Sequence, residues 1–302
     1  MNGKPNTAPL SAEFAARVLR DVPMSKHTSW HAGGPADLLF VPRDATDLAA
    51  FVRQLPPDVP LLWVGLGSNL LVRDGGFRGA VVVTHGALGR IARVSATGID
   101  AEAGVPCARI AKQCVQWGLG PAEFFAGIPG TLGGALAMNA GAWGGETWKH
   151  VVQVDVLDRR GVRRTRKATD FDIGYRSVRG LDGEWFVAAR LEFEHKPSVR
   201  TGTIRKLLER RRDTQPIGAW SCGSVFTNPP GEHAARLIES AGLKGFRIGD
   251  ASVSEKHANF IINHGAARAG DIEAVIRHAQ RIVAAVHGIA LQTEVRIVGE
   301  AA

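Results

Sequence analysis

Residues 126–146, AGIPGTLGGALAMNAGAWGGE, are the part of the sequence best suited to hold a phosphorylated ligand. Glycine allows a backbone with positive φ and lets a second surface approach closely. Unpaired amide N–H groups in such a bend form a concavity that binds anions, and the positive end of a following helix adds to it. Residues 131–139 can form that helix. Taken alone, the stretch is also explained as a glycine-rich connection between two elements.

A second glycine turn, GLGSNL at residues 65–70, begins like a dinucleotide-binding fingerprint. Leu70 stands where the third glycine belongs, and the residues after it resemble a strand where the fingerprint needs a helix. We therefore expect no Rossmann site, but a phosphate turn of another type remains open, because Ser68 and Asn69 add side-chain donors. The glycines of GIPGTLGG are not followed by lysine, which excludes a Walker P-loop.

Three polar residues stand in unusual surroundings. Arg176 lies in DIGYRS beside the only tyrosine of the chain, Tyr175, whereas Ser224 lies in the glycine-flanked turn SCGSVFTNP. Glu294 falls on the polar face of the last predicted strand. On spacing alone, a salt-bridged arginine, a turn serine and an exposed strand glutamate are the favoured explanations.

The composition indicates a globular protein. The chain has 302 residues, of which 45% are hydrophobic, and a net charge of +8. Its basic runs at 159–167 and 205–212 lack the alternating aromatic residues of a single-strand binder, so a solvated basic surface explains most of the excess. The segment before residue 15 has no secretory leader, and no apolar run approaches the length of a membrane span. We expect a cytoplasmic protein.

Residues that could bind metal or form disulfides do not occur in a typical pattern. Cys107, Cys114 and Cys222 form no CxxC pair and are expected to be reduced thiols, the first two as small core residues of one helix. His27 and His31 lack the glutamate of an HExxH motif, and no metal site is expected.

The hydrophobic pattern predicts an α+β fold rather than a doubly wound sheet, because helices and strands do not alternate strictly. The expected units span residues 1–85, 86–200 and 201–302, although the last strand could pack outside the third. Expected helices lie at 11–20 (with Phe14, Val18 and Leu19 on one face), 44–55 (capped by Asp44), 106–117, 203–212, 232–242 and 271–287. In the last of these, apolar residues follow the three-four spacing of one buried face, at Ile272, Val275, Ile276, Ala279, Ile282, Val283 and Val286. Expected strands lie at 61–64, 70–72, 80–84, 91–96, 99–103, 151–157, 162–165, 185–194, 258–263 and 291–298. The strands at 91–96 and 99–103 are expected to form a hairpin, and the last strand alternates, with Leu291, Thr293, Val295 and Ile297 on one face.

Six segments occur in an order that closely resembles the UDP-N-acetylenolpyruvoylglucosamine reductase family. They are GLGSNLLVRDGGFRGAVV, GIPGTLGGALAMNAGAWGGE, GYRS, TQPIGAWSCGSVFTNPPG, AGLKGFRIGDASVSEKHANFIIN and the terminal EVRIVG. The resemblance extends from about residue 27 to residue 299. It implies two subdomains that form an FAD-binding fold of the PCMH type and a C-terminal α+β subdomain that binds the substrate.

The resemblance also implies which residues form the site. Non-covalent FAD would contact Gly65, Gly67, Ser68, Asn69, Leu70, Gly130, Thr131, Gly134, Asn139 and Gly141. The catalytic positions match Arg176, Ser224 and Glu294, and the substrate-side positions match Tyr175, Asn228 and Trp143. The expected partners are small molecules only, with no nucleic acid and no membrane, and a monomer is expected.

The implied reaction is the NADPH-driven reduction of UDP-N-acetylglucosamine enolpyruvate to UDP-N-acetylmuramate, a step of peptidoglycan precursor synthesis. Flavin N5 would give hydride to the β carbon, Arg176 would stabilise the enolate and Ser224 would protonate the α carbon. Glu294 would polarise the site or relay a proton. No separate nicotinamide fold is visible, so NADPH is expected to leave before the sugar nucleotide enters the same cleft.

Two departures from the family pattern affect these expectations. Thr227 stands where many members carry lysine, and the short loop after GYRS leaves no room for the tyrosine-bearing insertion of one subclass. Two other classes of function remain open. One is an FAD-dependent oxidase of the same superfamily, in which His31 could tether the flavin. The other is a non-enzymatic protein that binds a sugar nucleotide or nucleic acid.

Overall fold

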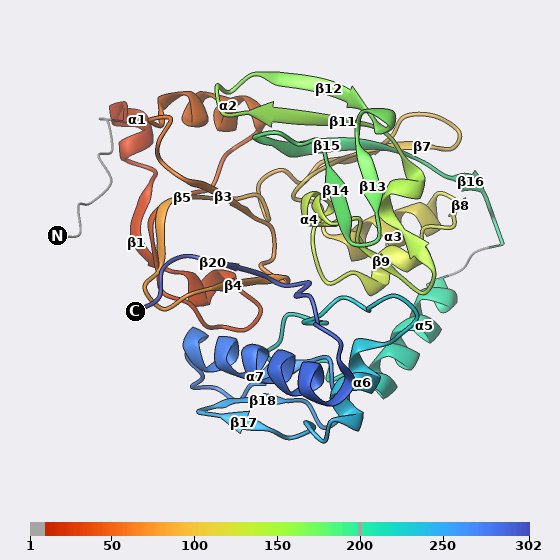
Figure 1. Cartoon of the computed structure of the whole chain (residues 1–302). Helices are drawn as coiled ribbons and strands as arrows, with labels where there is room; N and C mark the ends of the chain where they lie inside the picture. Colours follow the sequence, from red (N-terminus) through yellow and green to blue (C-terminus); the bar gives the residue numbers. More distant parts are fainter. Residues whose placement is uncertain (1–9, 199–200) are drawn as a thin grey trace. The chain divides into compact units, whose positions relative to one another are not determined.

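The computed structural model describes residues 10–198 and 201–302, which divide into two units (Figure 1). Among the described residues, unit 1 comprises 10–20, 38–66, 79–198 and 201–209. Unit 2 comprises residues 21–37, 67–78 and 210–302. The boundaries expected from the sequence at residues 85 and 200 stay a prediction, and residue 200 lies outside the described ranges.

A five-stranded antiparallel sheet forms the larger part of unit 1. Its order is β12 (Arg163–Lys167), β11 (Val151–Asp158), β15 (Glu184–Glu192), β7 (Gly98–Glu102) and β6 (Ile91–Arg93). Figure 1 shows α3 (Cys107–Gln116) and α4 (Leu132–Ala137) beneath one face of this sheet. Val154 and Leu191 on the strands and Ile110 and Leu136 on the helices are buried in one cluster. The predicted hairpin and the predicted helix after Pro106 are confirmed.

A four-stranded sheet has the order β1 (Leu19–Pro23), β2 (Pro35–Phe40), β5 (Phe77–Val83) and β3 (Leu61–Val64), and the division between the units falls within β1, β2 and β5. In unit 1, Asp44 caps helix α2 (Ala45–Gln54) by accepting hydrogen bonds from two backbone amides. This is the predicted cap. Phe51 of α2 stacks on Phe40 with ring centroids 4.0 Å apart, which fixes the helix on its cluster.

Helix α7 (Ala269–His287) organises unit 2. It packs against the three-stranded sheet of β17 (Arg247–Ile248), β18 (Ala251–Val253) and β19 (Ile261–Asn263), and against α6 (Ala234–Ser240) (Figure 1). Its buried residues include Ile272, Val275, Ile276, Ala279 and Val283, as the spacing predicts. The expectation for Val286 is wrong, because that side chain is 57% exposed in the last turn of the helix.

The shorter elements complete the described part of the chain. They are α1 (Ala12–Ala15), η1 (Met24–His27), β4 (Leu70–Val72), β8 (Leu119–Gly120), η2 (Glu123–Gly127), β9 (Gly141–Ala142), β10 (Gly145–Glu146), η3 (Thr147–His150), η4 (Ala168–Asp170), β13 (Asp172–Gly174), β14 (Ser177–Arg179), β16 (Glu194–His195), α5 (Thr201–Thr214) and β20 (Arg296–Val298). The helix predicted over 11–20 ends at Ala15, and Leu19 is exposed at the start of β1. Pairing of β1 with β2 therefore overrides the local helical spacing.

The last predicted strand is also shorter than expected. Only Arg296–Val298 forms β20, which pairs in parallel with β4 in unit 2. Before it, the Thr227 amide donates to the Gln292 carbonyl and the Glu294 amide donates to the Val225 carbonyl. Because the chain changes its pairing partner here, Thr293 is exposed although it was expected to share a face with buried Leu291.

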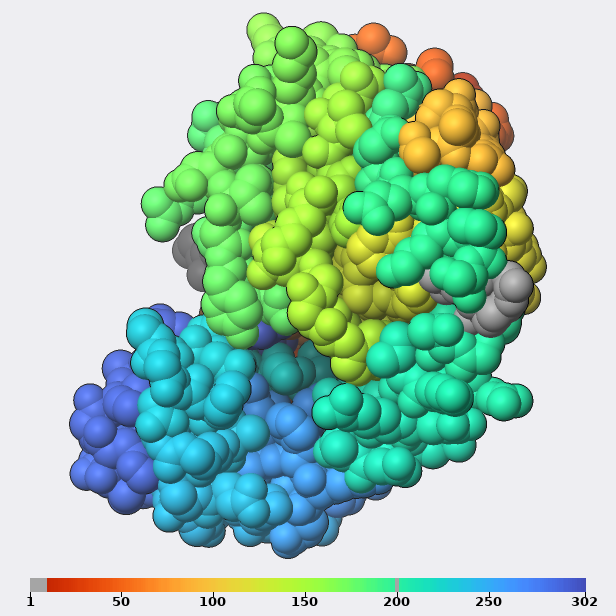
Figure 2. Space-filling model, turned by 90° about the vertical axis from the view of Figure 1, so that its right-hand side faces the viewer, coloured from red at the N-terminus to blue at the C-terminus, as the bar shows by residue number. Residues whose placement is uncertain are grey.

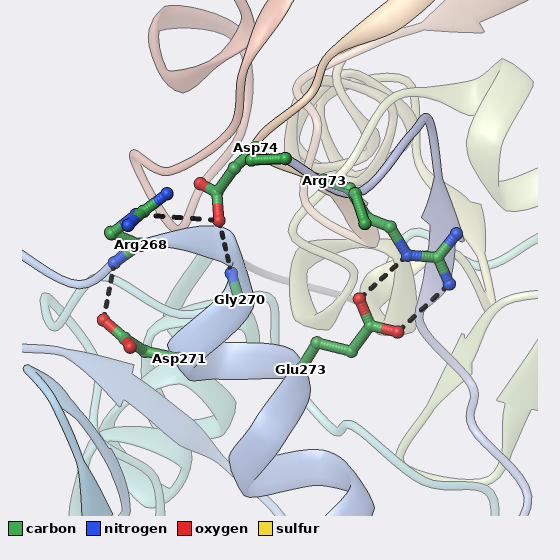
Figure 3. A pocket seen from close by; sticks show the side chains of 8 residues that line it. Arg73, Asp74, Arg268, Gly270, Asp271 and Glu273 are labelled. Carbon is green, nitrogen blue, oxygen red and sulfur yellow. Dashed lines mark hydrogen bonds and ion pairs between the residues drawn. The ribbon is translucent and has the colours of Figure 1, made fainter.

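A pocket of about 290 Å³ lies in unit 2 at the start of α7 (Figure 3). The Asp74 carboxylate accepts from the amides of Ala269 and Gly270 at 3.0 and 2.8 Å, so a distant residue caps this helix. The Arg73 guanidinium makes a bidentate pair with Glu273 at 2.8 and 3.0 Å and also donates to the Gly299 carbonyl. These contacts join β4, the C-terminal segment and α7.

The Arg73–Glu273 pair makes the stability of the protein depend on pH. The Arg73 guanidinium, helped by Arg277, holds the pKa of Glu273 below its usual value. The ionised carboxylate therefore stabilises the fold above the unfolded pKa of about 4.3, and this contribution is lost as the pH falls through the lower folded pKa. We expect Glu273→Gln to lower the free energy of unfolding by about 1–2 kcal/mol at pH 7.

Urea denaturation at pH 7 and at low pH checks this expectation. The difference between wild type and Glu273→Gln should shrink as the pH falls, because a protonated glutamate resembles glutamine. Glu209→Gln is the matched control, since its pair with Arg205 is exposed and contributes little. An equal difference at every pH would show that the charge of Glu273 is not what stabilises α7.

Candidate active site

Two of the glycine segments meet within unit 1. A Cβ atom placed on Gly65, directly after β3, would collide with the Thr131 hydroxyl. Thr131 is 2% exposed and pairs with Pro106, while the Gly130 carbonyl accepts a hydrogen bond from the Cys107 amide at 2.9 Å. The structure therefore brings together two residues that the sequence places in separate cofactor-binding motifs.

Gly134 offers an open surface beside this contact. It is exposed on helix α4, for which Thr131 is the N-cap, and a Cβ atom built on it would meet no atom within 4 Å. A bare backbone of this kind lets a ligand come closer than any side chain would permit. The predicted helix over 131–139 is confirmed in its central part, Leu132–Ala137.

Asn139 joins the glycine-rich stretch to the next hairpin. It is buried, with φ 45°, a left-handed conformation that asparagine tolerates better than most residues. Its side-chain amide donates to the Gly174 carbonyl at 3.0 Å and accepts from the Trp148 amide at 3.1 Å. A Cβ atom on Gly141 would collide with the Gly145 carbonyl, so the β9–β10 turn requires glycine there.

Arg176 occupies the two-residue turn between β13 and β14. Its φ is 53°, which costs strain in a residue other than glycine. Its guanidinium donates to the main-chain carbonyls of Asn139 and Gly141 at 3.3 and 3.1 Å, and its carbon lies 5.1 Å from the ring centroid of Tyr175. The arginine fork is therefore oriented by the glycine-rich stretch. The sequence suggests only a loop here, because the turn and its acceptors depend on tertiary structure.

The substrate-side candidates of unit 1 are aromatic and accessible. Tyr175 is 52% exposed at the tip of the same hairpin. Trp143 is 37% exposed in the β9–β10 turn, with φ 50°. Exposed aromatic rings on tight turns are suited to contact with a ligand.

The remaining cofactor candidates lie in unit 2. Gly67 has φ +62°, and a Cβ atom there would collide with the His27 carbonyl, while Leu70 is buried at the start of β4. Ser68 is half-buried in the turn between them. The Asn69 side chain donates to the Glu294 main-chain carbonyl at 3.0 Å, and the Asn69 carbonyl accepts from the Arg296 amide. Asn69 thus holds a predicted catalytic residue, a role that the sequence does not indicate.

Ser224 and Glu294 lie on adjacent segments of unit 2. Ser224 is half-buried and directly precedes Val225, whose carbonyl accepts the Glu294 amide at 2.8 Å. The main chain therefore brings together two of the three predicted catalytic residues. Thr227, at the position of the frequent lysine, donates from its amide to the Gln292 carbonyl at 3.0 Å.

Asn228 has a structural partner. Its side-chain oxygen accepts a hydrogen bond from the Ala234 amide at 3.1 Å, at the first residue of α6. This contact stabilises the start of that helix, because the first amides of a helix lack intrahelical acceptors. Its exposed side chain keeps amide donors that could reach a ligand.

The three cysteines are free and buried, as expected for small core residues. Burial raises the pKa of the Cys114 and Cys222 thiols to about 12 and raises that of Cys107 as well. Thiols of this kind are poor nucleophiles at neutral pH. In residues 10–198 and 201–302, no group of three His, Cys, Asp or Glu residues could hold a metal ion.

Acidic neighbours pair with several arginines of the basic run at 159–167. Figure 2 shows the segment near residue 165, in green, at the surface of unit 1. Arg164 pairs with Asp158 at 2.6 Å, and Arg166 pairs with Glu184 at 2.7 Å. Four of the six basic residues of the run pair with three carboxylates, those of Asp155, Asp158 and Glu184, so its charge is offset in part. None of the helices in the described ranges is long and apolar enough to cross a membrane.

Gly134→Ala separates cofactor binding from stability. Alanine should raise the helical stability of α4 by about 0.5–1 kcal/mol, because no atom lies near the new methyl group. The same methyl group should hinder a dinucleotide at this surface and weaken FAD binding about tenfold, or 1.4 kcal/mol. Fluorescence titration with FAD and thermal unfolding measure the two effects. Gly202→Ala on α5 is the control, since it also meets no atom within 4 Å and lies outside the cofactor candidates. Equal FAD affinity in both variants would place the cofactor elsewhere.

Comparisons with known proteins show two domain models and several relatives that match the chain. The model of an FAD binding domain matches residues 36–166, and the model of the C-terminal domain of UDP-N-acetylenolpyruvoylglucosamine reductase matches residues 215–298. Reductases of that name from Alkalilimnicola ehrlichii and from Legionella pneumophila (strain Paris) are 59% and 50% identical to the chain. The alignments cover 92% of this chain and 94% of the first relative, and 96% of both this chain and the second.

A solved structure of a reductase of the same name is also similar to the chain. The crystal structure of the reductase from Thermus caldophilus is 32% identical, with a TM-score of 0.79, and the match covers 93% of this chain and 98% of that one. The expected α+β class, with an FAD-binding domain and a reductase C-terminal domain, is confirmed. On this evidence, the chain belongs to the UDP-N-acetylenolpyruvoylglucosamine reductase family.

Proposed function

We propose that this protein uses FAD and NADPH to reduce UDP-N-acetylglucosamine enolpyruvate to UDP-N-acetylmuramate, in the synthesis of peptidoglycan precursors. The observation that carries this proposal is the family match over both functional segments, the FAD-binding residues 36–166 and the C-terminal residues 215–298 that contain Ser224 and Glu294. FAD, when bound, would supply the hydride for this reduction.

In this proposal Arg176 stabilises the negative charge that develops on the substrate. Addition of hydride to the β carbon moves charge onto the α carbon and its carboxylate. The guanidinium is already oriented by the Asn139 and Gly141 carbonyls, so it need not reorganise when that charge appears. Its planar fork can also bind a carboxylate at two points.

Ser224 is the proposed proton donor to the α carbon. A serine hydroxyl is a weak acid in water, but a carbanion-like enolate is basic enough to take its proton. The main chain after Ser224 is fixed by the hydrogen bonds of Val225. Glu294 is proposed to polarise the site around Ser224 or to return a proton to it. The hydrogen bond from the Glu294 amide to the Val225 carbonyl keeps the two segments adjacent.

The residues proposed to hold FAD are of types that can bind a dinucleotide. They combine bare backbone at Gly65, Gly67, Gly130, Gly134 and Gly141 with polar groups at Ser68, Asn69, Thr131 and Asn139, and with Leu70. The open surface at Gly134 and the contact between Gly65 and Thr131 support this assignment. Tyr175, Trp143 and Asn228 are proposed substrate contacts.

We further propose a cytoplasmic monomer that acts on small molecules and binds neither membrane nor nucleic acid. The ion pairs along residues 159–167 support the last point, because they engage four of the six basic side chains of that run with acidic neighbours. The nicotinamide is proposed to reduce FAD first and to leave as NADP⁺ before the sugar nucleotide binds. Initial rates with both substrates varied should then give parallel double-reciprocal plots, whereas intersecting lines would require a ternary complex.

The oxidase and binding-protein alternatives are distinguished by one anaerobic experiment. The yellow protein is bleached with one equivalent of NADPH and then mixed with either UDP-N-acetylglucosamine enolpyruvate or aerated buffer. The proposed function predicts that colour returns much faster with the sugar nucleotide. Faster return with oxygen would indicate an oxidase, and a colourless protein that takes up no FAD would indicate a binding protein.

A further inference from the structure

We infer that Asn259 is a positioning residue for Ser224, an inference that rests on the proposed role of that serine. Asn259 is 4% exposed, and its side chain faces the main chain of Phe226. Its oxygen accepts from the Phe226 amide at 2.9 Å, and its nitrogen donates to the Phe226 carbonyl at 2.8 Å. One side chain therefore satisfies both backbone groups of a buried residue, as a neighbouring strand would.

The main chain of Asn259 adds a third hydrogen bond to the same segment. Its carbonyl accepts from the Val225 amide at 2.9 Å. The Val225 carbonyl, in turn, accepts a hydrogen bond from the Glu294 amide at 2.8 Å. The two residues that follow Ser224 are thus held between Asn259 and the segment of Glu294, and Val225 and Phe226 are almost fully buried.

Asn259 is itself firmly held, which a positioning residue requires. Its neighbours Ala258 and Phe260 are buried, and β19 begins two residues later at Ile261. The Ser254 amide donates to the Phe260 carbonyl at 2.9 Å, which closes the turn that presents Asn259. The amide group therefore has a fixed base in the core of unit 2.

Loss of this side-chain amide should move Ser224 without affecting steps that do not use it. An apolar residue at 259 leaves the Phe226 amide and carbonyl buried and unpaired, so the segment must shift or admit water. A shift of about 1 Å at a reacting group can cost about 100-fold in rate. Reduction of the flavin by NADPH needs no proton from Ser224 and should be unchanged.

The test measures the two half-reactions of Asn259→Leu by anaerobic stopped flow. We expect reoxidation by UDP-N-acetylglucosamine enolpyruvate to slow about 100-fold, and reduction by NADPH to stay within about twofold of wild type. Asn259→Ser retains a short polar group and serves as a milder variant should the leucine variant fail to fold. Amide hydrogen exchange at Phe226 should accelerate in both variants, even without substrate.

Asn263→Leu is the matched control. Asn263 is also 4% exposed, but its side chain binds the amides of Gly265 and Ala267 and the Trp30 carbonyl. Its loss should lower stability to a similar extent and leave reoxidation within about threefold of wild type. Equal slowing of reoxidation by Asn259→Leu and Asn263→Leu would overturn the inference.

A double-mutant cycle separates positioning from general damage. If Asn259 acts through Ser224, then Asn259→Leu should slow reoxidation no further in a Ser224→Ala background. Additive losses would overturn the inference while leaving the proposed function intact. Wild-type protein that the substrate cannot reoxidise would instead contradict the proposed function, and the role of Asn259 with it.

Discussion

Ser224→Ala should slow reduction of UDP-N-acetylglucosamine enolpyruvate by about 10²- to 10⁴-fold, the range typical of a lost general acid. Reduction of the bound flavin by NADPH should stay at the wild-type rate, because that step needs no proton from the serine. Stopped-flow absorbance near 450 nm, recorded for each half-reaction, measures both rates.

Ser221→Ala is the control for this variant. Ser221 is half-buried in the same turn, three residues before Ser224, and is not placed in the proposed site. It should leave both half-reactions unchanged. If Ser224→Ala slowed the two half-reactions equally, Ser224 would be a structural residue and the proton donor would have to be sought elsewhere.

Arg176→Lys should lower the rate of substrate reduction about 10²- to 10³-fold, comparable to the loss of one preorganised donor at a developing negative charge. Lysine keeps the charge but cannot present a planar fork. Its single ammonium would have to replace two guanidinium donors that bind the Asn139 and Gly141 carbonyls, so it would not point where the arginine does. The measurement is reoxidation at saturating substrate.

Arg179→Lys is the matched control, because Arg179 belongs to β14 of the same hairpin and its exposed side chain pairs with Asp172 at 3.6 Å. It should reoxidise at the wild-type rate. Should Arg176→Lys behave like Arg179→Lys, charge alone would be sufficient at this position and the orientation of the fork would be unimportant.

Elements with strong local signals could be predicted from the sequence. Asp44 marked the start of α2, and the three-four spacing located the buried face of α7. Leu19 and residues 291–295 were predicted wrongly, because pairing between distant segments decides their conformation. A local pattern cannot report that β1 pairs with β2, or that the chain around Glu294 changes from one partner to another.

The residues of the candidate site also divide into those that sequence motifs identify and those that only the tertiary structure reveals. The glycine-rich motifs and Arg176, Ser224 and Glu294 were named from motifs that resemble a family, and their roles here are proposals. The residues that hold them could not be named, because the contacts are distant in sequence. Asn69 binds the carbonyl of a residue 225 positions away, and Asn259 binds a residue 33 positions away. An asparagine in a buried turn has no sequence signature that identifies its partner.

The central claim is that the glycine-rich segments hold FAD and that the reduced cofactor passes its electrons to an enolpyruvyl sugar nucleotide. The most direct test is an anaerobic single turnover. NADPH-reduced protein is mixed with one equivalent of UDP-N-acetylglucosamine enolpyruvate, and flavin absorbance and product mass are followed together. The account predicts that colour returns as one UDP-N-acetylmuramate, two hydrogens heavier than the substrate, forms per flavin. Protein that takes up no FAD, or flavin that stays bleached with the substrate unchanged, would contradict it.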